Sequence, residues 1–279
     1  MGLMPADETG PAGAGSVTGG PLPGGLLDRL DGRPAPDAAD LTGWHRADPE
    51  QLAADLALLR DHGYLTLALP TRFGGAGLNL AEVACAQRQL AARAPAAAWA
   101  VNAHHAWVGA AADALASGDV TDLGPVWVLG QAARGRMFAS DIGGDLGTPP
   151  VIPPATEGSA LLAGRYAWEL ALAGMTGYAI ARRMFDQAVA RAEQAGRSLD
   201  RWPVAEASLR LDDMRGRLDD VIGRWRQRVA AGGGLTTLDP GRLGLIREFT
   251  ARHVAADGAE RVAGLAALIA DGTVAAAHA

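Results

Sequence analysis

Apolar positions recur along most of this chain with the period of a helix rather than that of a strand. The clearest example lies between residues 203 and 230, where apolar residues follow one another at steps of three and four. They are Leu211, Met214, Leu218, Val221, Trp225 and Val229. This spacing puts them on one side of a helix, as in the seam of a helical bundle. Strand alternation is nearly absent elsewhere, so the pattern predicts an all-α bundle of roughly six or seven helices.

Two helices in the first half of the chain have local start signals. Asp48 followed by Pro49 is typical of an N-cap and a first helical residue, and Gly63 is typical of a helix stop. Asn79 with Glu82 three residues later is typical of a capping box. We therefore predict one helix between Asp48 and Gly63, and a second that begins after Asn79.

The segments around these helices have weaker signals. Residues 64–70 (YLTLALP) are predicted to be extended, and a glycine-rich turn is expected to follow. The mostly apolar stretch 96–118 predicts a buried helix, and 125–136 a less regular one. Residues 161–169 (LLAGRYAWE) are ambiguous between helix and strand.

The second half is expected to hold two long helices, one ending at Gly196 and one opening at Pro203. Between the halves lie residues 141–159, in which four prolines and four glycines exclude a helix or a central strand.

Four segments follow from these patterns and from the resemblance described below. Residues 1–25 are rich in glycine and proline and are expected to be a disordered lead-in. We expect an N-terminal helical domain over 26–140, a bridge over 141–169 and a C-terminal helical bundle over 170–279.

Charge and composition exclude several classes of protein. The net charge of -6 disfavours a nucleic-acid partner. All 25 basic residues are arginine, which excludes Schiff-base chemistry and a P-loop lysine. We find no apolar run of membrane-spanning length and no signal peptide, so a cytoplasmic protein with no membrane partner is expected. The single cysteine, Cys85, is expected to be a small buried apolar residue.

Several elements of the first half recur together in one known family. They are a helix ending at Gly63, an extended segment to Pro70, a GGxG turn at Gly74, Gly75 and Gly77, and a following helix. In this order and spacing, the chain resembles the N-terminal helical domain of the acyl-CoA dehydrogenase superfamily. Residues 177–192 and 202–225 are similar to the C-terminal bundle of that family, in the variety shared with flavin-dependent hydroxylases.

The resemblance also implies a loss. In that family a β-barrel domain separates the two helical domains and forms one wall of the flavin site. Here only the bridge stands in its place, and a catalytic glutamate and the flavin-contacting C-terminal end have no counterpart. The resemblance therefore implies a truncated member with its helical domains joined directly, no flavin or other cofactor, and a cleft between the two halves.

One group of candidate site residues lies on the predicted helix 96–118. His104 is a candidate general acid or base, because histidine titrates near neutral pH. The alternative is a core histidine that hydrogen-bonds a backbone carbonyl. The candidates for substrate binding on this helix are Trp99, Asn102, His105 and Trp107.

A second group lies on the first helix of the second half. Tyr178 and Arg182 are four residues apart and would orient an oxygen-rich or enolate substrate, with Tyr178 as a catalytic candidate. Glu169 is a candidate base if it is buried. The alternatives are a core tyrosine, a solvated arginine and a surface carboxylate. The remaining candidates for substrate binding are Asp141, Tyr166, Trp168 and Met175.

Together these expectations predict a flavin-independent enzyme that cyclises or isomerises a hydrophobic small molecule, such as a polyketide intermediate in natural product biosynthesis. A cycloaddition or a rearrangement belongs to the same group of reactions. The alternatives are a non-catalytic partner subunit of a full-length flavoprotein, and a residual FAD-dependent oxidoreductase. No metal site is expected, and a homodimer is expected from the prevalence of two-fold symmetry.

Overall fold

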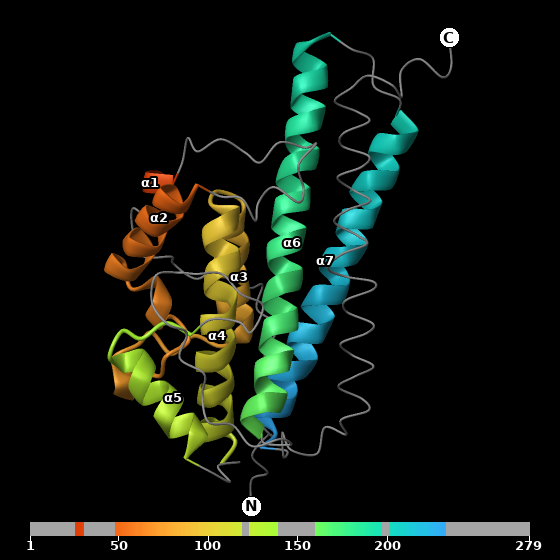
Figure 1. Cartoon of the computed structure of the whole chain (residues 1–279). Helices are drawn as coiled ribbons and strands as arrows, with labels where there is room; N and C mark the ends of the chain where they lie inside the picture. Colours follow the sequence, from red (N-terminus) through yellow and green to blue (C-terminus); the bar gives the residue numbers. More distant parts are fainter. Residues whose placement is uncertain (1–25, 31–47, 119–122, 139–159, 197–200, 233–279) are drawn as a thin grey trace, which may run out of the picture.

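The computed structural model describes residues 26–30, 48–118, 123–138, 160–196 and 201–232 (Figure 1). Its helices are α1 (Leu26–Leu30), α2 (Pro49–Asp61), α3 (Leu80–Ala91), α4 (Pro95–Ala116), α5 (Gly124–Ala133), α6 (Ala160–Gln194) and α7 (Arg201–Ala230). Two short 3-10 helices, η2 (Tyr64–Thr66) and η3 (Thr71–Phe73), follow α2. The described residues contain no strand, which confirms the predicted all-α class.

The two longest helices, α6 and α7, lie side by side, and α3 and α4 pack against α6 from the other direction (Figure 1). Small residues allow α4 and α6 to approach closely. A Cβ atom added to Gly109 on α4 would lie 2.4 Å from the Trp168 ring on α6. A Cβ atom added to Gly164 on α6 would lie 3.1 Å from the Cβ atom of Ala110. The centre of the molecule is therefore a close α4–α6 contact.

The predicted helix starts in the first half are confirmed. The Asp48 side chain accepts a hydrogen bond from the Glu50 amide at 3.0 Å, and α2 begins with the next residue, Pro49. The Asn79 side chain accepts from the Glu82 amide at 3.3 Å, while the Glu82 carboxylate accepts from the Asn79 amide at 2.9 Å. This is the predicted capping box, and α3 begins directly after it.

The prediction of an extended segment over 64–70 is wrong, because a 3-10 turn begins at Tyr64. The successive residues Leu67, Ala68 and Leu69 are all buried, which a half-exposed strand cannot achieve. The following glycine-rich turn folds back onto this segment, and a Cβ atom at Gly75 would lie 2.0 Å from the Leu69 carbonyl oxygen. Burial against the bundle therefore overrides the local β propensity of this segment.

The ambiguous stretch 161–169 forms the first turns of α6. Leu161, Trp168 and Leu172 are buried at helical spacing on the side that packs against the core. The helix runs without a break across the boundary predicted between residues 169 and 170. The predicted lead-in and residues 141–159 lie outside the described residues, as does everything after residue 232.

The predicted seam of α7 is confirmed at Leu211, Met214, Leu218 and Trp225, whereas Val221 and Val229 are only half-buried. Its buried residues are Ala207, Leu211, Met214, Leu218, Ile222 and Trp225. Ile222 takes the place predicted for Val221, which is only half-buried. A repeat of 3.5 residues drifts relative to a helix of 3.6 residues per turn, so a step of four replaces a step of three.

The opposite face of α7 carries ion pairs between residues four apart, including Arg217–Asp213 at 2.8 Å and Arg215–Asp219 at 3.6 Å. Cys85 on α3 is buried, as predicted. Within the described ranges, no helix is both long enough and apolar enough to cross a lipid bilayer.

Candidate functional site

His104 is buried on α4 and both of its ring nitrogens contact backbone atoms. The Phe138 amide donates to its Nδ1 atom at 3.3 Å, so Nε2 carries the proton and donates to the Leu65 carbonyl at 2.8 Å. Burial lowers the pKa of His104 to about 4, against the opposing effect of the Leu65 hydrogen bond. The ring ties α4 to η2 and to the segment after α5. Both ring nitrogens are thus occupied, as in the alternative of a core histidine bonded to a backbone carbonyl. The predicted catalytic role stays a prediction.

His105 is also buried, and its ring packs edge-on against two other rings. The centroid distances are 5.3 Å to Tyr64 and 5.6 Å to His104. Neither of its ring nitrogens has a hydrogen-bond partner within the described part of the chain. Burial, and second the neighbouring His104, hold its pKa well below the ordinary value. His105 is therefore a neutral ring in the core, closed off from solvent.

Asn102 belongs to a buried chain of hydrogen bonds that joins three helices. Tyr64 donates from its hydroxyl to the Gln87 side chain at 2.8 Å, and Gln87 donates to Asn102 at 2.8 Å. Asn102 in turn donates to the Thr176 hydroxyl on α6 at 3.3 Å. These groups satisfy one another, so the chain of bonds stabilises the packing of α3, α4 and α6.

Trp107 and Glu169 meet at a second cluster between α4 and α6. The Arg165 guanidinium lies over the Trp107 ring at 4.7 Å and over the Tyr166 ring at 5.5 Å. It also forms an ion pair with Glu169, at 3.3 Å between Nη2 and Oε2. The half-buried Glu169 carboxylate is thus held by a cation. Its role as a base stays a prediction.

Trp168 forms part of a contact that sequence reasoning missed. Its indole N–H donates to the Asp113 Oδ2 atom on α4 at 2.7 Å, and the indole of Trp225 on α7 donates to the same oxygen at 2.8 Å. Burial raises the pKa of Asp113, although the two hydrogen bonds oppose this. A lone acidic residue in the apolar stretch 96–118 is the signal that would have pointed to Asp113.

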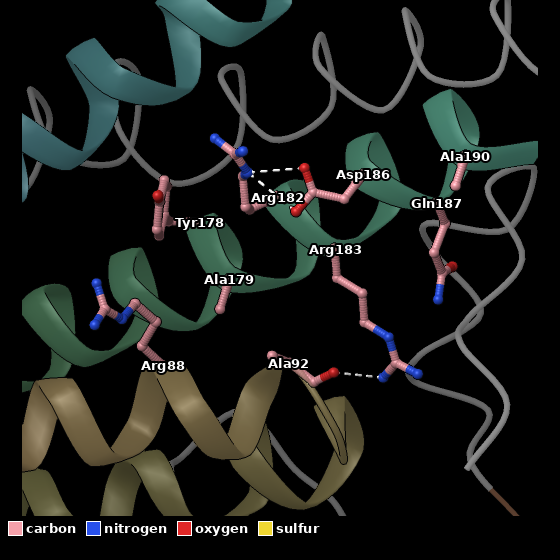
Figure 2. Close-up of a pocket in the computed structure, with 9 residues that line it drawn as sticks. All are labelled: Arg88, Ala92, Tyr178, Ala179, Arg182, Arg183, Asp186, Gln187 and Ala190. Carbon is pink, nitrogen blue, oxygen red and sulfur yellow. Dashed lines mark hydrogen bonds and ion pairs between the residues drawn. The ribbon is translucent and has the colours of Figure 1, made fainter. Parts of the chain in front are cut away.

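Tyr178 and Arg182 lie together in an open groove of about 500 Å³ along α6 (Figure 2). Most of the lining comes from α6, and Arg88 and Ala92 at the end of α3 line the opposite side. The charged and polar groups that line it are Arg88, Tyr178, Arg182, Arg183, Asp186 and Gln187. The lining runs from Tyr178 to Ala190, which corresponds to roughly 18 Å of helix. A second open hollow of about 380 Å³ shares Asp186 and Ala190 and continues between α6 and the start of α7.

Two of the three arginines in the groove have defined protein partners. Arg182 donates from Nε to both carboxylate oxygens of Asp186, at 3.0 and 3.1 Å, which raises the pKa of the guanidinium. Arg183 donates to the carbonyls of Ala92 and Arg93 at the end of α3, at 2.5 and 3.3 Å. Its charge thereby stabilises the C-terminus of α3.

Arg88 and Tyr178 are less constrained. Within the described residues the Arg88 guanidinium has one polar contact, with the Cys85 sulfur at 3.8 Å. Tyr178 is only 5% exposed and lines the groove. Its hydroxyl makes no hydrogen bond to a described residue. Neither group therefore has a strong polar partner among the described residues.

The structure thus divides the candidate site residues. Tyr178 and Arg182 share the groove, whereas Met175, one turn earlier on α6, is buried in the core. Trp99 is half-buried on α4 and does not line the groove, and Asp141 lies outside the described residues. Sequence reasoning missed four of the groove residues, Arg88, Arg183, Asp186 and Gln187. Asp186 could have been found from its spacing of four residues from Arg182, which is typical of an ion pair on one helix. No sequence pattern points to Arg88.

No protein-family model, curated protein or solved structure matches this chain, so the resemblance to the acyl-CoA dehydrogenase superfamily stays a prediction.

Proposed function

We propose that this chain is a cofactor-independent isomerase or cyclase that acts in the α3–α6 groove on a hydrophobic small molecule, such as a polyketide intermediate. The observation that carries the proposal is that the Tyr178 hydroxyl, which makes no hydrogen bond to a described residue, lines one groove with the Arg182–Asp186 ion pair. An acid, a cation and a carboxylate beside small apolar residues suit chemistry that passes through an enolate.

The reaction needs no oxidant or reductant. Asp186 accepts a proton from the carbon next to a substrate carbonyl, and the electron pair of that C–H bond becomes the carbon–carbon double bond of an enolate. Tyr178 donates a hydrogen bond to the enolate oxygen, and Arg182 adds a positive charge nearby. Where the substrate has a double bond between its β and γ carbons, the enolate is a dienolate, and returning the proton from Asp186 to the γ carbon gives the conjugated isomer. Attack of the enolate carbon on a second carbonyl gives a ring, and the new alkoxide takes the proton back from Asp186.

The experiment is a turnover assay without added flavin, nicotinamide or metal. Medium-chain diketo acids and their thioesters are incubated with the purified chain, and isomers and cyclic products are followed by liquid chromatography and mass spectrometry. We expect Tyr178→Phe to lower kcat about a hundredfold, since it removes a donor to the developing oxyanion.

The matched control is Tyr64→Phe, which deletes a hydroxyl that bonds Gln87 in the core. It should lower stability by about 1 kcal/mol and leave kcat unchanged. Turnover that is indifferent to Tyr178→Phe, or no turnover over the whole panel, contradicts the proposal.

A second candidate is a non-catalytic subunit of a full-length flavoprotein. One observation favours it: Trp202 and Leu209 are 78% and 68% exposed on α7 and lie two turns apart, on one face. This candidate predicts co-elution with a flavoprotein encoded beside this chain, and loss of co-elution in Leu209→Asp. Elution of the chain at its own mass of 28.6 kDa in such a mixture contradicts it. Homodimer formation likewise stays a prediction.

A further inference from the structure

We infer that the groove takes an elongated apolar monocarboxylate and that the Arg88 guanidinium anchors its carboxylate. This inference rests on the proposed function only in that both use the same groove. It names the chemical class of the ligand, which neither the sequence pattern nor the proposed reaction fixes.

Among the described residues that line the groove, one arginine has no strong polar partner. Arg182 is neutralised by Asp186, to which it donates at 3.0 Å, and Arg183 is held by the last carbonyls of α3. Arg88, by contrast, contacts only the Cys85 sulfur among the described residues. At 3.8 Å this is a weak interaction that a ligand can replace at small cost. A single uncommitted positive charge favours a monoanion.

Arg88 also has the geometry that a carboxylate requires. It extends from α3 toward α6, on the side of α6 from which Ala179 points (Figure 2). The planar guanidinium presents two N–H groups in parallel, which match the two oxygens of a carboxylate. Arg88 is half-buried, and the methyl groups of Ala92 and Ala179 line the groove beside it. This apolar surrounding strengthens an ion pair relative to one in open solvent.

The remainder of the groove suits an apolar body rather than a second anion. Its small residues on α6, Ala179 and Ala190, lie roughly 16 Å apart along the helix. The adjoining hollow adds Phe185, Val189 and Val204. Asp186 lines both spaces but is paired with Arg182, whereas the adjoining hollow adds the Glu193 carboxylate. The Glu193 carboxylate disfavours a second anionic group at that end of the ligand.

The test is isothermal titration of the full chain with decanoate below its micelle concentration, compared with methyl decanoate and decyl phosphate. We expect decanoate to bind about tenfold or more tightly than its methyl ester, because the ester lacks the charge. Arg88→Met keeps most of the apolar stem and should weaken decanoate binding about tenfold or more, with methyl decanoate unaffected. Arg88→Lys should restore part of the affinity, since a point charge replaces a bidentate one.

The matched control is Arg217→Met, which removes an arginine from an exposed ion pair of α7 outside the groove. It should leave decanoate affinity unchanged. Equal binding of decanoate and its ester, or unchanged affinity in Arg88→Met, overturns the inference. Tighter binding of decyl phosphate than of decanoate overturns the assignment to carboxylates.

The two proposals fail separately. If Arg88→Met abolishes decanoate binding while no keto acid or thioester is turned over, the binding of a carboxylate by Arg88 is supported and the proposed reaction is contradicted. If thioesters are turned over with a rate that depends on Tyr178, but Arg88→Met leaves the KM of the corresponding acids unchanged, the reaction stands and the anchor falls.

Discussion

The polar residues of α4 and those lining the groove on α6 look alike in the sequence and differ in the structure. Both groups place histidine, tyrosine, arginine or amide side chains within helices rich in alanine. On α4, His104 and Asn102 bond to the chain's own backbone and side chains. In the groove, the Tyr178 hydroxyl and the Arg88 guanidinium have no such bond to a described residue. His105 on α4 also lacks a described partner, but its ring is closed off in the core, so a binding site is distinguished by unengaged groups that line an open groove.

The comparison predicts that changes on the α4 side alter the free energy of unfolding, and changes in the groove alter ligand affinity. The largest effect is expected for Gly109→Leu, since even a Cβ atom there would lie 2.4 Å from the Trp168 ring. The free energy of unfolding in urea should fall by about 4 kcal/mol or more. Gly216→Leu is the matched control, because a Cβ atom there meets nothing within 4 Å. Similar stabilities of the two variants would show that α4 and α6 do not pack this closely.

The next effect concerns pH. Burial lowers the pKa of His104 to about 4 from its ordinary value of 6.5, so the unfolded chain binds a proton that the folded chain does not. Stability should therefore fall as the pH falls from 6.5 toward 4, by about 3 kcal/mol from this residue. Urea unfolding at a series of pH values measures this slope. His104→Gln should flatten it in part, because the buried His105 adds a slope of the same sign, and an unchanged slope would argue that His104 reaches solvent.

A smaller effect is expected for Asp113→Ala, which leaves the indole N–H groups of Trp168 and Trp225 without their shared acceptor. The loss should be about 2 kcal/mol, since relief from burying the Asp113 carboxylate offsets part of the cost. Thermal unfolding checks this against Asp213→Ala, whose side chain is exposed on α7. Decanoate affinity should be unchanged. A parallel loss of decanoate binding would show that the α4 cluster and the groove are energetically coupled, contrary to the comparison of the two regions.

The smallest effect on stability is expected for Arg182→Met in the groove. The side chains of Arg182 and Asp186 are 40% and 54% exposed, and an ion pair of this kind contributes below about 0.5 kcal/mol. The unfolding curve should therefore nearly coincide with that of the unaltered chain. A loss on the scale of Asp113→Ala would place Arg182 among the residues that hold the fold.

Features encoded within a few residues could be predicted from the sequence, and features that depend on distant contacts could not. The cap at Asp48 and the capping box at Asn79 are local, and both are confirmed. Residues 64–70 were mispredicted because burial against distant helices decides their conformation. Arg88 and Tyr178 line one groove only through the register between α3 and α6, which no local spacing reveals. Ile222 rather than Val221 is buried because a repeat of 3.5 residues drifts relative to the 3.6 residues of a helical turn.

The oxygen that Trp168 and Trp225 share also bears on the order in which the chain assembles. Its two donors are separated from Asp113 by 55 and 112 residues along the sequence. Closing the shorter loop costs less entropy, so α6 is expected to reach α4 before α7 does. Once Trp168 has fixed the carboxylate, the indole of Trp225 finds its acceptor already oriented. Helix α7 thus docks onto a surface that α4 and α6 have already formed. In a chain that ends before α7, the Asp113 carboxylate would lack the hydrogen bond from Trp225 and would be more exposed to solvent.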